Sequence, residues 1–450
     1  MAETYPADAF APLEKGQDIQ AISRPSLSYW QDAWIRLKAN RRALFSLWLV
    51  VGLLLFTFLG PVVWQVDPAL QDVDQISQAP GADRTVTLVP DYVPWDGSAS
   101  GTGLRFVEPP TTQYVRLAWD PMPGASEYRI YRTPYAIAGS GAYGLPLQES
   151  VEPFFEDLLD LRPMNYFYTI VALDAAGEET EQFQTIEGSL SRVITLNEAR
   201  ERGMVGPEET PPLGSTYELK WHPLGTDYLG RDMLARLMHG ARVSLFIGFF
   251  APFLYVLIGV IYGSTAGFLG GMTDQVLMRF ADFVVALPFL LFMILFKVMT
   301  NTGPGESGIL PMLFAMVILL WPATARLVRG QILQIREEGY ISASRLLGAK
   351  TGYLVLRHMI PNTMGVILVT ITFAVPSAIF TEAFLSFIGM GVAPPTPSWG
   401  SMCNEGIKTM LTHPHELIFP ALFISITVLA FNLLGDGLRD ALDARMRNRE

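Results

Sequence analysis

Charged residues and cysteines are both scarce in this 450-residue chain. Asp, Glu, Lys and Arg together make up 17% of it, whereas about a quarter is usual in soluble domains, so the composition argues against an ordinary cytosolic enzyme. The single cysteine, Cys403, excludes a disulfide-stabilised secreted module and a multi-cysteine metal site. A net charge of −11 offers no overall basic surface for nucleic acid. The sequence also lacks a Gly-x4-Gly-Lys-Ser/Thr loop, so any ATP hydrolysis must come from a partner.

Half of the residues are hydrophobic, and they gather in long runs with few charges. The runs are 43–64, 243–273, 276–299, 307–325, 363–390 and 417–435. Each can cross a bilayer core of about 30 Å as a helix that rises about 1.5 Å per residue. The run 276–299 is interrupted by Arg279, Asp282 and Lys297, so we expect six spans, or five if that run is re-entrant. Arg279 and Asp282 stand three residues apart, which predicts that they pair on one helix face.

Basic residues beside the runs predict how the chain is threaded. Arg36, Lys38, Arg41 and Arg42 precede the first run, which indicates a cytoplasmic N-terminus. Six spans then also place the basic segment 326–358 and the C-terminal tail in the cytoplasm. The long polar stretch after the first run must lie outside the cytoplasm. Residues 66–222 contain 24 acidic and 10 basic residues, so the remainder of the chain is mildly basic.

These patterns divide the chain into four parts. Residues 1–42 form a cytoplasmic segment, 43–65 the first transmembrane helix, 66–220 an extracytoplasmic insert, and 221–450 a transmembrane domain with a cytoplasmic loop at about 327–361. The expected location is therefore a bacterial cytoplasmic membrane, with lipid as a partner.

Short stretches with alternating polarity predict strands within the insert. They lie at 114–119, 127–131 and 166–172, and the segments 90–103 and 204–215 are rich in turn residues and predict linkers. Trp119, the Tyr128-x-Ile130-Tyr131 strand and Leu161-x-Pro163 before Tyr166 resemble a fibronectin type III domain over about 104–196. The resemblance assigns Tyr166 a hydrogen bond back to the preceding loop. Another antiparallel sandwich is the alternative.

A glycine-rich segment precedes the second run. It reads His222-Pro-Leu-Gly-Thr-Asp-Tyr-Leu-Gly-Arg-Asp232 and predicts a turn that leads into an amphipathic helix at the outer interface, with Asp232 in the first turn. Its candidate functional residues are Gly225, Thr226, Asp227, Gly230, Arg231 and Asp232. Further on, Gly259, Gly263 and Gly267 put a smooth stripe on one helix face, which favours either a pore-lining helix or close packing within the bundle.

The cytoplasmic loop holds two short helical segments around a glycine. Gly348 is expected to end the first segment, and Pro361 suits the first turn of the next span. Such a projecting helix–glycine–helix, which we call the knob, has a shape suited to docking into a groove of another protein. Its candidate residues are Ser342, Ala343, Ser344, Gly348, Ala349, His358, Pro361 and Asn362.

The knob and five further segments resemble the permease subunits of ATP-binding-cassette importers. The family signature Glu-Ala-Ala, three residues, Gly is matched by Ser342-Ala343-Ser344 and Gly348, although a serine replaces the acid. The segments at 222–232, 240–242, 357–362, 394–400 and 433–440 resemble the C-type permease of the dipeptide, oligopeptide and nickel group. The insert is the feature in which this chain differs from that group.

The resemblance implies the type I importer fold and a subunit without catalysis of its own. The whole chain would then be an α-helical polytopic membrane protein with six transmembrane helices and an extracytoplasmic all-β sandwich insert. Implied partners are a B-type permease, two cytoplasmic ATPases that use ATP and Mg²⁺, and an extracytoplasmic binding protein that delivers oligopeptides or dipeptides. Nickel chelates or another small solute remain alternatives as cargo.

Other classes of function have weaker support in the sequence. A secondary transporter would need intramembrane carboxylates, and Glu382 is a lone candidate, either on the translocation path or in a structural hydrogen bond. A membrane-anchored adhesion protein would need only one span. Cys403, His413 and His415 do not have the spacing of a common metal site, so we expect no metal and no cofactor bound by this chain.

Overall fold

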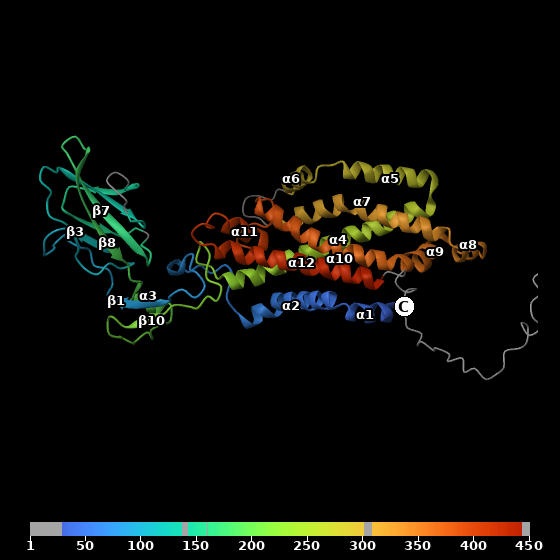
Figure 1. The fold of residues 1–450 in the computed structure, drawn as a ribbon, viewed down its shortest axis with the longest axis horizontal. Helices are drawn as coiled ribbons and strands as arrows, with labels where there is room; N and C mark the ends of the chain where they lie inside the picture. The colour runs from blue at the N-terminus through green and yellow to red at the C-terminus, as the bar shows by residue number, and fades with distance from the viewer. Residues whose placement is uncertain (1–28, 137–142, 160, 301–307, 443–450) are drawn as a thin grey trace, which may run out of the picture. The chain divides into compact units, whose positions relative to one another are not determined.

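The computed structural model describes residues 29–136, 143–159, 161–300 and 308–442 of the chain. They form two compact units. The membrane unit lies within Met1–Pro80 and His222–Glu450, and the insert unit is Gly81–Trp221. Figure 1 shows the membrane unit as a bundle of long helices and the insert unit as mostly strands. Residues 66–80, which follow the first span, thus belong with the membrane unit.

The membrane unit is helical throughout its spans. Its helices are α1 Tyr29–Ala39, α2 Arg41–Val63, α4 Met233–Leu269, α5 Gly271–Val285, α6 Phe289–Met299, α7 Ile309–Arg336, α8 Gly339–Leu346, α9 Thr351–Leu354, α10 Ile360–Phe387, α11 Trp399–Gly406 and α12 His415–Leu442. A 3-10 turn, Val73–Gln75, follows α2, and a π-helical turn, Val355–Met359, joins α9 to α10. Within the described residues, five helical segments are long and apolar enough to cross a membrane: α2, α4, α7, α12 and the continuous segment from α9 to α10.

The remaining apolar run is a bent pair of helices. α5 and α6 meet at 81° across a short break. Pro288 is the residue that caps α6, and its ring disfavours helical geometry in the residue before it, so α5 cannot continue. The pair brings the number of spans to six if it crosses the bilayer, and leaves five if it is re-entrant.

α4 and α7 form the centre of the bundle, and glycines on α4 allow their close approach. A Cβ atom on Gly259 would lie 2.6 Å from the Thr324 side chain, and one on Gly263 would collide with the Ala325 carbonyl oxygen. Gly267 faces Arg329 and Ile332 of α7 in the same way. The glycine stripe therefore packs two helices of this chain together, as small residues do in lipid, which is the packing alternative and not the pore-lining one.

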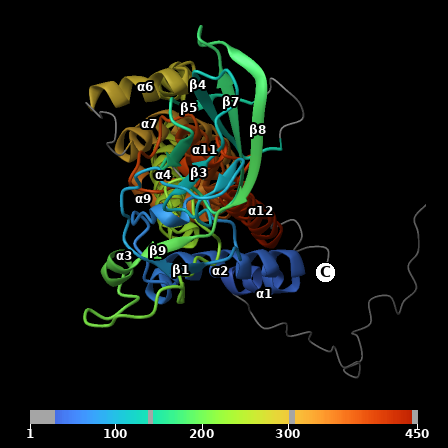
Figure 2. The ribbon, with the colours of Figure 1, turned by 90° about the vertical axis from the view of Figure 1, so that its left-hand side faces the viewer.

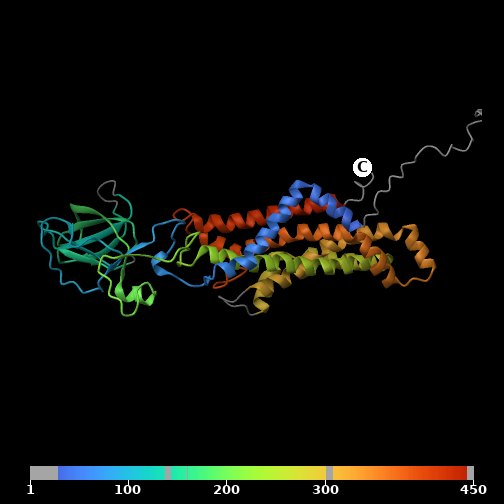
Figure 3. The same ribbon diagram turned by 90° about the horizontal axis from the view of Figure 1, so that it is seen from below.

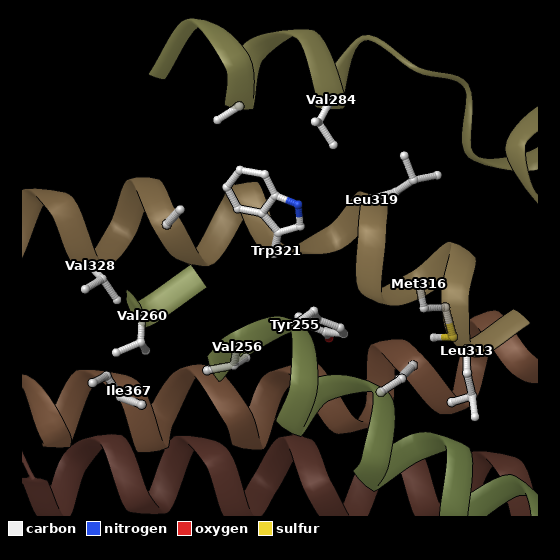
Figure 4. Close-up of a cluster of buried hydrophobic side chains, with 14 of the residues drawn as sticks. Tyr255, Val256, Val260, Val284, Leu313, Met316, Leu319, Trp321, Val328 and Ile367 are labelled. Atoms are coloured by element: carbon white, nitrogen blue, oxygen red, sulfur yellow. The ribbon is translucent and has the colours of Figure 1, made fainter. Parts of the chain in front are cut away.

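Large side chains fill the space around this contact. Figure 4 shows Trp321 of α7 pointing toward α5, from which Val284 points back, while Val256 and Val260 of α4 lie on the other side of α7. The rings of Trp321 and Tyr262 are 4.4 Å apart. α5, α7 and α4 thus share one buried core.

Asp282 does not pair with Arg279, so the expectation from their spacing is wrong. Its carboxylate lies 2.7 Å from the Arg326 guanidinium of α7. The neighbouring Asp274 accepts two hydrogen bonds of 2.5 Å from Arg329. Spacing along one helix cannot identify a cation on the next helix, and here the contact between α5 and α7 supplies it.

The insert unit contains ten strands and one short helix among its described residues. They are β1 Thr85–Val89, β2 Arg105–Phe106, β3 Val115–Ala118, β4 Glu127–Thr133, β5 Pro146–Ser150, β6 Phe154–Asp157, β7 Asn165–Leu173, β8 Glu179–Ser189, β9 Val193–Thr195, α3 Leu196–Glu201 and β10 Thr216–Glu218. Two antiparallel sheets, β2-β3-β6 and β5-β4-β7-β8, enclose a core that includes Leu117, Ile130 and Tyr168. Figure 2 shows β8 as the long strand at the sheet edge. We call this part the sandwich.

A second, smaller part, which we call the stem, consists of β1, β9, β10 and α3. β1 pairs with β9 in parallel and with β10 in antiparallel orientation. Val86, Leu88, Ile194 and Leu219 form its core. The stem brings the beginning and the end of the insert together, since the Leu219 N–H donates to the Arg84 carbonyl at 2.9 Å.

The segments expected to be linkers are packed instead. The Arg116 guanidinium donates a 2.5 Å hydrogen bond to the Val93 carbonyl, and Trp95 packs on Phe154 with ring centroids 5.3 Å apart. Val205, in the other segment, is buried in the stem core. Proline and glycine mark where regular strands end, but they do not show whether the irregular chain has a surface to pack on.

Among the described residues, Tyr166 has no partner for the hydrogen bond that the resemblance assigns to it. Among the described contacts, it packs under the Arg132 guanidinium at 5.2 Å. The buried hydroxyl that does reach a partner is that of Tyr168, which donates to Asp157 at 2.8 Å. Burial raises the pKa of Tyr168, and the Asp157 carboxylate raises it further, so this phenol stays a donor.

Candidate functional site

The glycine-rich segment before α4 folds tightly against the chain that follows α2. Gly225 and Gly230 adopt positive φ angles of 75° and 74°. A Cβ atom on either glycine would collide with backbone of residues 72–80, so only glycine fits. Thr226 bridges the same two segments: its hydroxyl donates to the Gln75 carbonyl and accepts from the Gln78 N–H at 2.9 Å.

Two arginines and two acids beside this turn form a buried network. Arg231 lies 2.8 Å from Asp227 and 2.9 Å from Glu405 of α11. Arg236 of α4 lies 2.7 Å from Glu405 and also pairs with Asp227. All four side chains are at most 9% exposed. Burial by itself lowers the pKa of Arg231, but Asp227 and Glu405 more than offset this and raise it above its ordinary value.

Asp232 connects the network to the start of α4. It is the N-cap, accepts from the Ala235 N–H at 2.6 Å, and satisfies one of the unpaired donors of the first turn. Its carboxylate also accepts from the Trp64 indole at 3.2 Å and lies 2.6 Å from Nδ1 of His222. The six residues that the sequence selected in this segment therefore lie together, and they join α2, α4 and α11.

The sequence did not single out Arg236 or Glu405. Arg236 falls within an amphipathic segment and Glu405 lies in α11, far along the chain, so no spacing connects them. One feature of the sequence could have identified them: both are charged residues within helices of otherwise apolar or small residues. An unpaired charge is costly there, so each predicts a buried partner.

Arg242 has a defined partner on α2. Pro61 lies inside α2 and has no N–H, so the carbonyl of Thr57, four residues earlier, lacks its helical donor. The Arg242 guanidinium donates to that carbonyl at 3.2 Å. Gly60 of α2 lies at the same contact between α2 and α4, and its lack of a side chain leaves room for the Met238 side chain. An arginine in an apolar helix is thus explained by a proline in its neighbour.

The knob consists of α8, α9 and the π-helical turn that leads into α10. Gly348 has a φ of 85°. The Ala349 N–H donates to the Ser344 carbonyl and the Gly348 N–H to the Arg345 carbonyl, at 3.1 and 3.0 Å, which is the Schellman arrangement that ends a helix. α9 is continuous with α10 through the π turn, so Pro361 lies within the first turn of a helix that has already begun.

One side of the knob is anchored in the bundle and the other is exposed. Ile341, Leu354 and Met359 are at most 1% exposed and belong to the same core as α4 and α7. Leu346 and Leu347 are each 89% exposed. Tyr353 of α9 and Leu356 of the π-helical turn are exposed as well.

A hydrogen bond holds the two halves of the knob together. The Asn362 amide donates to the Tyr340 hydroxyl and to the His358 carbonyl, both at 2.8 Å. The His358 ring lies between Tyr340 and Tyr353, at centroid distances of 6.4 and 5.4 Å. The selected residues Ser342 and Ala343 lie on the exposed side of α8. Ser344 is half-buried, and its hydroxyl donates to the Tyr340 carbonyl.

Two stretches of the chain match known protein families. Residues 257–448 match the family described as binding-protein-dependent transport system inner membrane component. Residues 28–80 match the N-terminal transmembrane domain of oligopeptide transport permease C. Over 228 residues the chain is 51% identical to the oligopeptide transport system permease protein OppC of Bacillus subtilis (strain 168), covering 51% of this chain and 73% of that protein. The chain belongs to this permease family.

Further relatives are similar over the same share of the chain. The dipeptide transport system permease protein DppC of Bacillus subtilis is 49% identical, with 50% of this chain and 69% of that protein covered. The glutathione transport system permease protein GsiD of Pectobacterium atrosepticum is 41% identical, with 50% and 74% covered. A solved inward-facing MetNI methionine ABC transporter matches with a TM-score of 0.39 and 17% identity, covering 47% of this chain and 98% of that chain.

The family matches lie on either side of the insert unit. The range 28–80 contains α1, α2 and the partners of Gly225, Thr226 and Gly230. The range 257–448 contains the knob, Glu382 and Glu405. Gly81–Trp221 lies between the two ranges.

Glu382 of α10 is buried within this chain. It is 0% exposed and accepts hydrogen bonds from Ser244 of α4 at 2.7 Å and from Ser386 at 2.8 Å. Ser244 in turn accepts from the Trp399 N–H of α11 at 3.3 Å. Glu382 therefore has hydrogen-bond partners on two helices of this chain, α4 and α10.

No metal site is found in the part of the chain that the structure describes. No group of three or more His, Cys, Asp or Glu side chains there could hold a metal ion. His415 instead lies 2.9 Å from the Thr226 carbonyl, through its Nε2.

Proposed function

We propose that the chain is the transmembrane permease subunit of an ATP-driven importer that moves peptides. With a second, B-type permease it forms the translocation pathway for oligopeptides or dipeptides that a binding protein delivers. The observation that carries this proposal is the knob, in a chain that belongs to the permease family. Relatives named for oligopeptides, dipeptides and glutathione support peptides as the cargo over nickel chelates.

The knob supports a mechanical link to two cytoplasmic ATPases. Leu346, Leu347 and Leu356 are exposed apolar side chains of the knob, and such side chains suit a hydrophobic groove. Ile341, Leu354 and Met359 tie the knob to the core of α4 and α7. A force on the exposed side chains would therefore reach the spans as a rigid-body movement and would drive alternating access, while ATP and Mg²⁺ are bound and used by the ATPases.

The orientation follows from the same proposal. If the knob is cytoplasmic and the α5–α6 pair crosses the bilayer, three spans separate the knob from the insert. The N-terminus and C-terminus then lie in the cytoplasm, and the insert lies outside. Lys38 at the end of α1 and Arg41 and Arg42 at the start of α2 agree with this orientation.

Purification of the tagged full chain from its native membranes tests the proposed function. We expect a second permease and ATPase subunits to co-purify, and proteoliposomes with ATP on the ATPase side to accumulate labelled dipeptides and oligopeptides. Uptake that needs an ion gradient and no ATP would contradict the proposal and favour a secondary transporter. A chain that purifies without any ATPase would also contradict it.

We propose further that the sandwich resembles a fibronectin type III domain and contacts the binding protein. The sheet orders β2-β3-β6 and β5-β4-β7-β8 support that likeness. Tyr135, Leu145, Leu158 and Leu159 are at least 50% exposed and lie in the β4–β5 and β6–β7 connections, at the same end of the sandwich. Exposed apolar loops of this kind suit a protein contact. A spacer that packs only on the permeases is the alternative.

Excision of residues 92–191 with a short glycine–serine bridge separates these two roles. The stem and its core remain, so the membrane unit and basal ATPase activity should be preserved. We expect weaker association of the binding protein, measured by titration onto the reconstituted complex. Affinity for the binding protein equal to that of the full chain would contradict a docking role and leave the spacer.

A further inference from the structure

α1 is a short helix with two different faces at the start of the first span. Its 11 residues reach about 16 Å at about 1.5 Å per residue, which is half of a bilayer core, so it cannot cross. On one face, Ala33 and Leu37 are buried, and Leu37 packs with Ala43 of α2 and Ala441 of α12. This face therefore holds α1 against the start of α2 and the end of α12.

The junction with α2 turns the helix away from the span. Asn40 is extended, with φ −80° and ψ 100°, and its side chain accepts from the N–H groups of Arg42 and Ala43. This cap ends one helix and begins the next. Figure 3 shows the change of direction between the two dark-blue helices.

The exposed part of α1 combines aromatic and basic side chains. Trp30 is 53%, Trp34 45% and Ile35 52% exposed. Lys38 lies 5.0 Å above the Trp34 ring. Phe45 and Trp48 in the first turns of α2 are exposed as well. Tryptophan beside lysine is the composition of a helix that rests in the interface between lipid and water.

Three cations at the junction of α1 and α2 are available to an anion. Arg41 and Arg42 are exposed, and among the described residues neither guanidinium lies within 4.0 Å of a carboxylate, whereas Arg36 pairs with Asp32 at 3.3 Å. With Lys38 they form a cluster at the point where α2 enters the apolar layer. Phosphate groups of lipid are the anions found at that depth.

We propose that α1 and the first turn of α2 form a binding surface for anionic phospholipid headgroups. Lys38, Arg41 and Arg42 bind the phosphates, while Trp30, Trp34 and Ile35 lie in the boundary between headgroups and acyl chains. Because Leu37 couples α1 to α12, a bound anionic lipid also stabilises the contact between the first and last spans. The inference depends on α2 crossing the membrane, and not on the cargo or on the ATPases.

A lipid titration of the purified full chain in detergent tests this surface. Brominated phosphatidylglycerol should quench tryptophan fluorescence at lower concentration than brominated phosphatidylcholine, and added sodium chloride should weaken the effect. The triple variant Lys38→Gln, Arg41→Gln, Arg42→Gln should need roughly 100-fold more phosphatidylglycerol, since each basic side chain near an anionic surface contributes about fivefold. Inorganic phosphate should not compete at equal concentration, because it lacks the acyl chains that the tryptophans contact.

The matched control removes the same charge elsewhere. Arg202, Lys220 and Lys408 are exposed and lie outside α1 and α2, and replacing all three by glutamine should leave the titration unchanged. The proposal is overturned if the two lipids quench equally, or if the α1 variant and the control lose affinity to the same extent. A Trp34→Phe variant should lose part of the quenched signal, and an unchanged signal would place the lipid elsewhere.

Discussion

Replacement of Arg236 by methionine should destabilise the membrane unit by about 3–5 kcal/mol. Arg236 is 2% exposed and balances Asp227 and Glu405 together with Arg231. Removing it leaves two buried carboxylates with one cation, and breaking a buried network on one side costs this much because the remaining charge has no water to solvate it. Thermal unfolding of the detergent-solubilised chain, followed by the loss of monodisperse protein, measures the effect.

A second substitution should restore much of that loss. Arg236→Met with Glu405→Gln returns the network to one acid and one base, so the double variant should be more stable than the single one. Lys408→Met is the control, since it removes the same charge from an exposed side chain near α11 and should be close to neutral. A single variant as stable as the unmodified chain would contradict the network's role, as would a double variant that is no better than the single one.

Replacement of Gly348 by valine should abolish transport while the chain still inserts in the membrane. The φ of 85° at Gly348 costs a β-branched residue at least about 1–2 kcal/mol, so the Schellman end of α8 is disfavoured. No atom lies within 4 Å of a Cβ placed there, so the effect comes from backbone strain and not from a clash. If the knob docks on ATPases as proposed, strain of that size predicts roughly 5- to 30-fold weaker binding of those subunits, measured by titration, and loss of ATP-driven uptake.

Two variants distinguish backbone strain from a general effect of mutating the knob. Gly348→Asn should transport almost normally, because asparagine tolerates positive φ better than other side chains. Gly352→Ala should also be tolerated, since Gly352 lies in helix α9 with open space around it. Equal transport by the valine and asparagine variants would show that the helix end at Gly348 has no part in coupling.

The spans were predictable because their signal is local. Twenty or so apolar residues in succession have few alternatives to a membrane helix, and the structure has helices at all six runs. The bent pair α5 and α6 also carried its signal in the sequence, through the charges that interrupt the run and Pro288. Strands β3, β4 and β7 were visible for the same reason, since period-two alternation is a property of neighbouring residues.

The partners of charged side chains were not predictable. Asp282 pairs with Arg326 and not with Arg279, and Arg231 reaches Glu405, because these contacts depend on which helices pack together. Pro61 is visible in the sequence and leaves the Thr57 carbonyl without its helical donor. The sequence does not show that Arg242 donates to this carbonyl instead.

The local patterns of the amino-acid sequence were enough to predict a polytopic membrane protein with a polar insert, to locate its helices and to recognise the motifs of a permease. The length of an apolar run, the basic residues beside it and the spacing of its glycines are properties of a single segment. They can therefore be recognised before the fold is known. The three-dimensional arrangement was needed to show that residues 72–80 pack against Gly225 and Gly230, that Glu382 is buried beside two serines, and that Ile341, Leu354 and Met359 anchor the knob. Those outcomes depend on distances between segments far apart in the chain, which packing alone establishes.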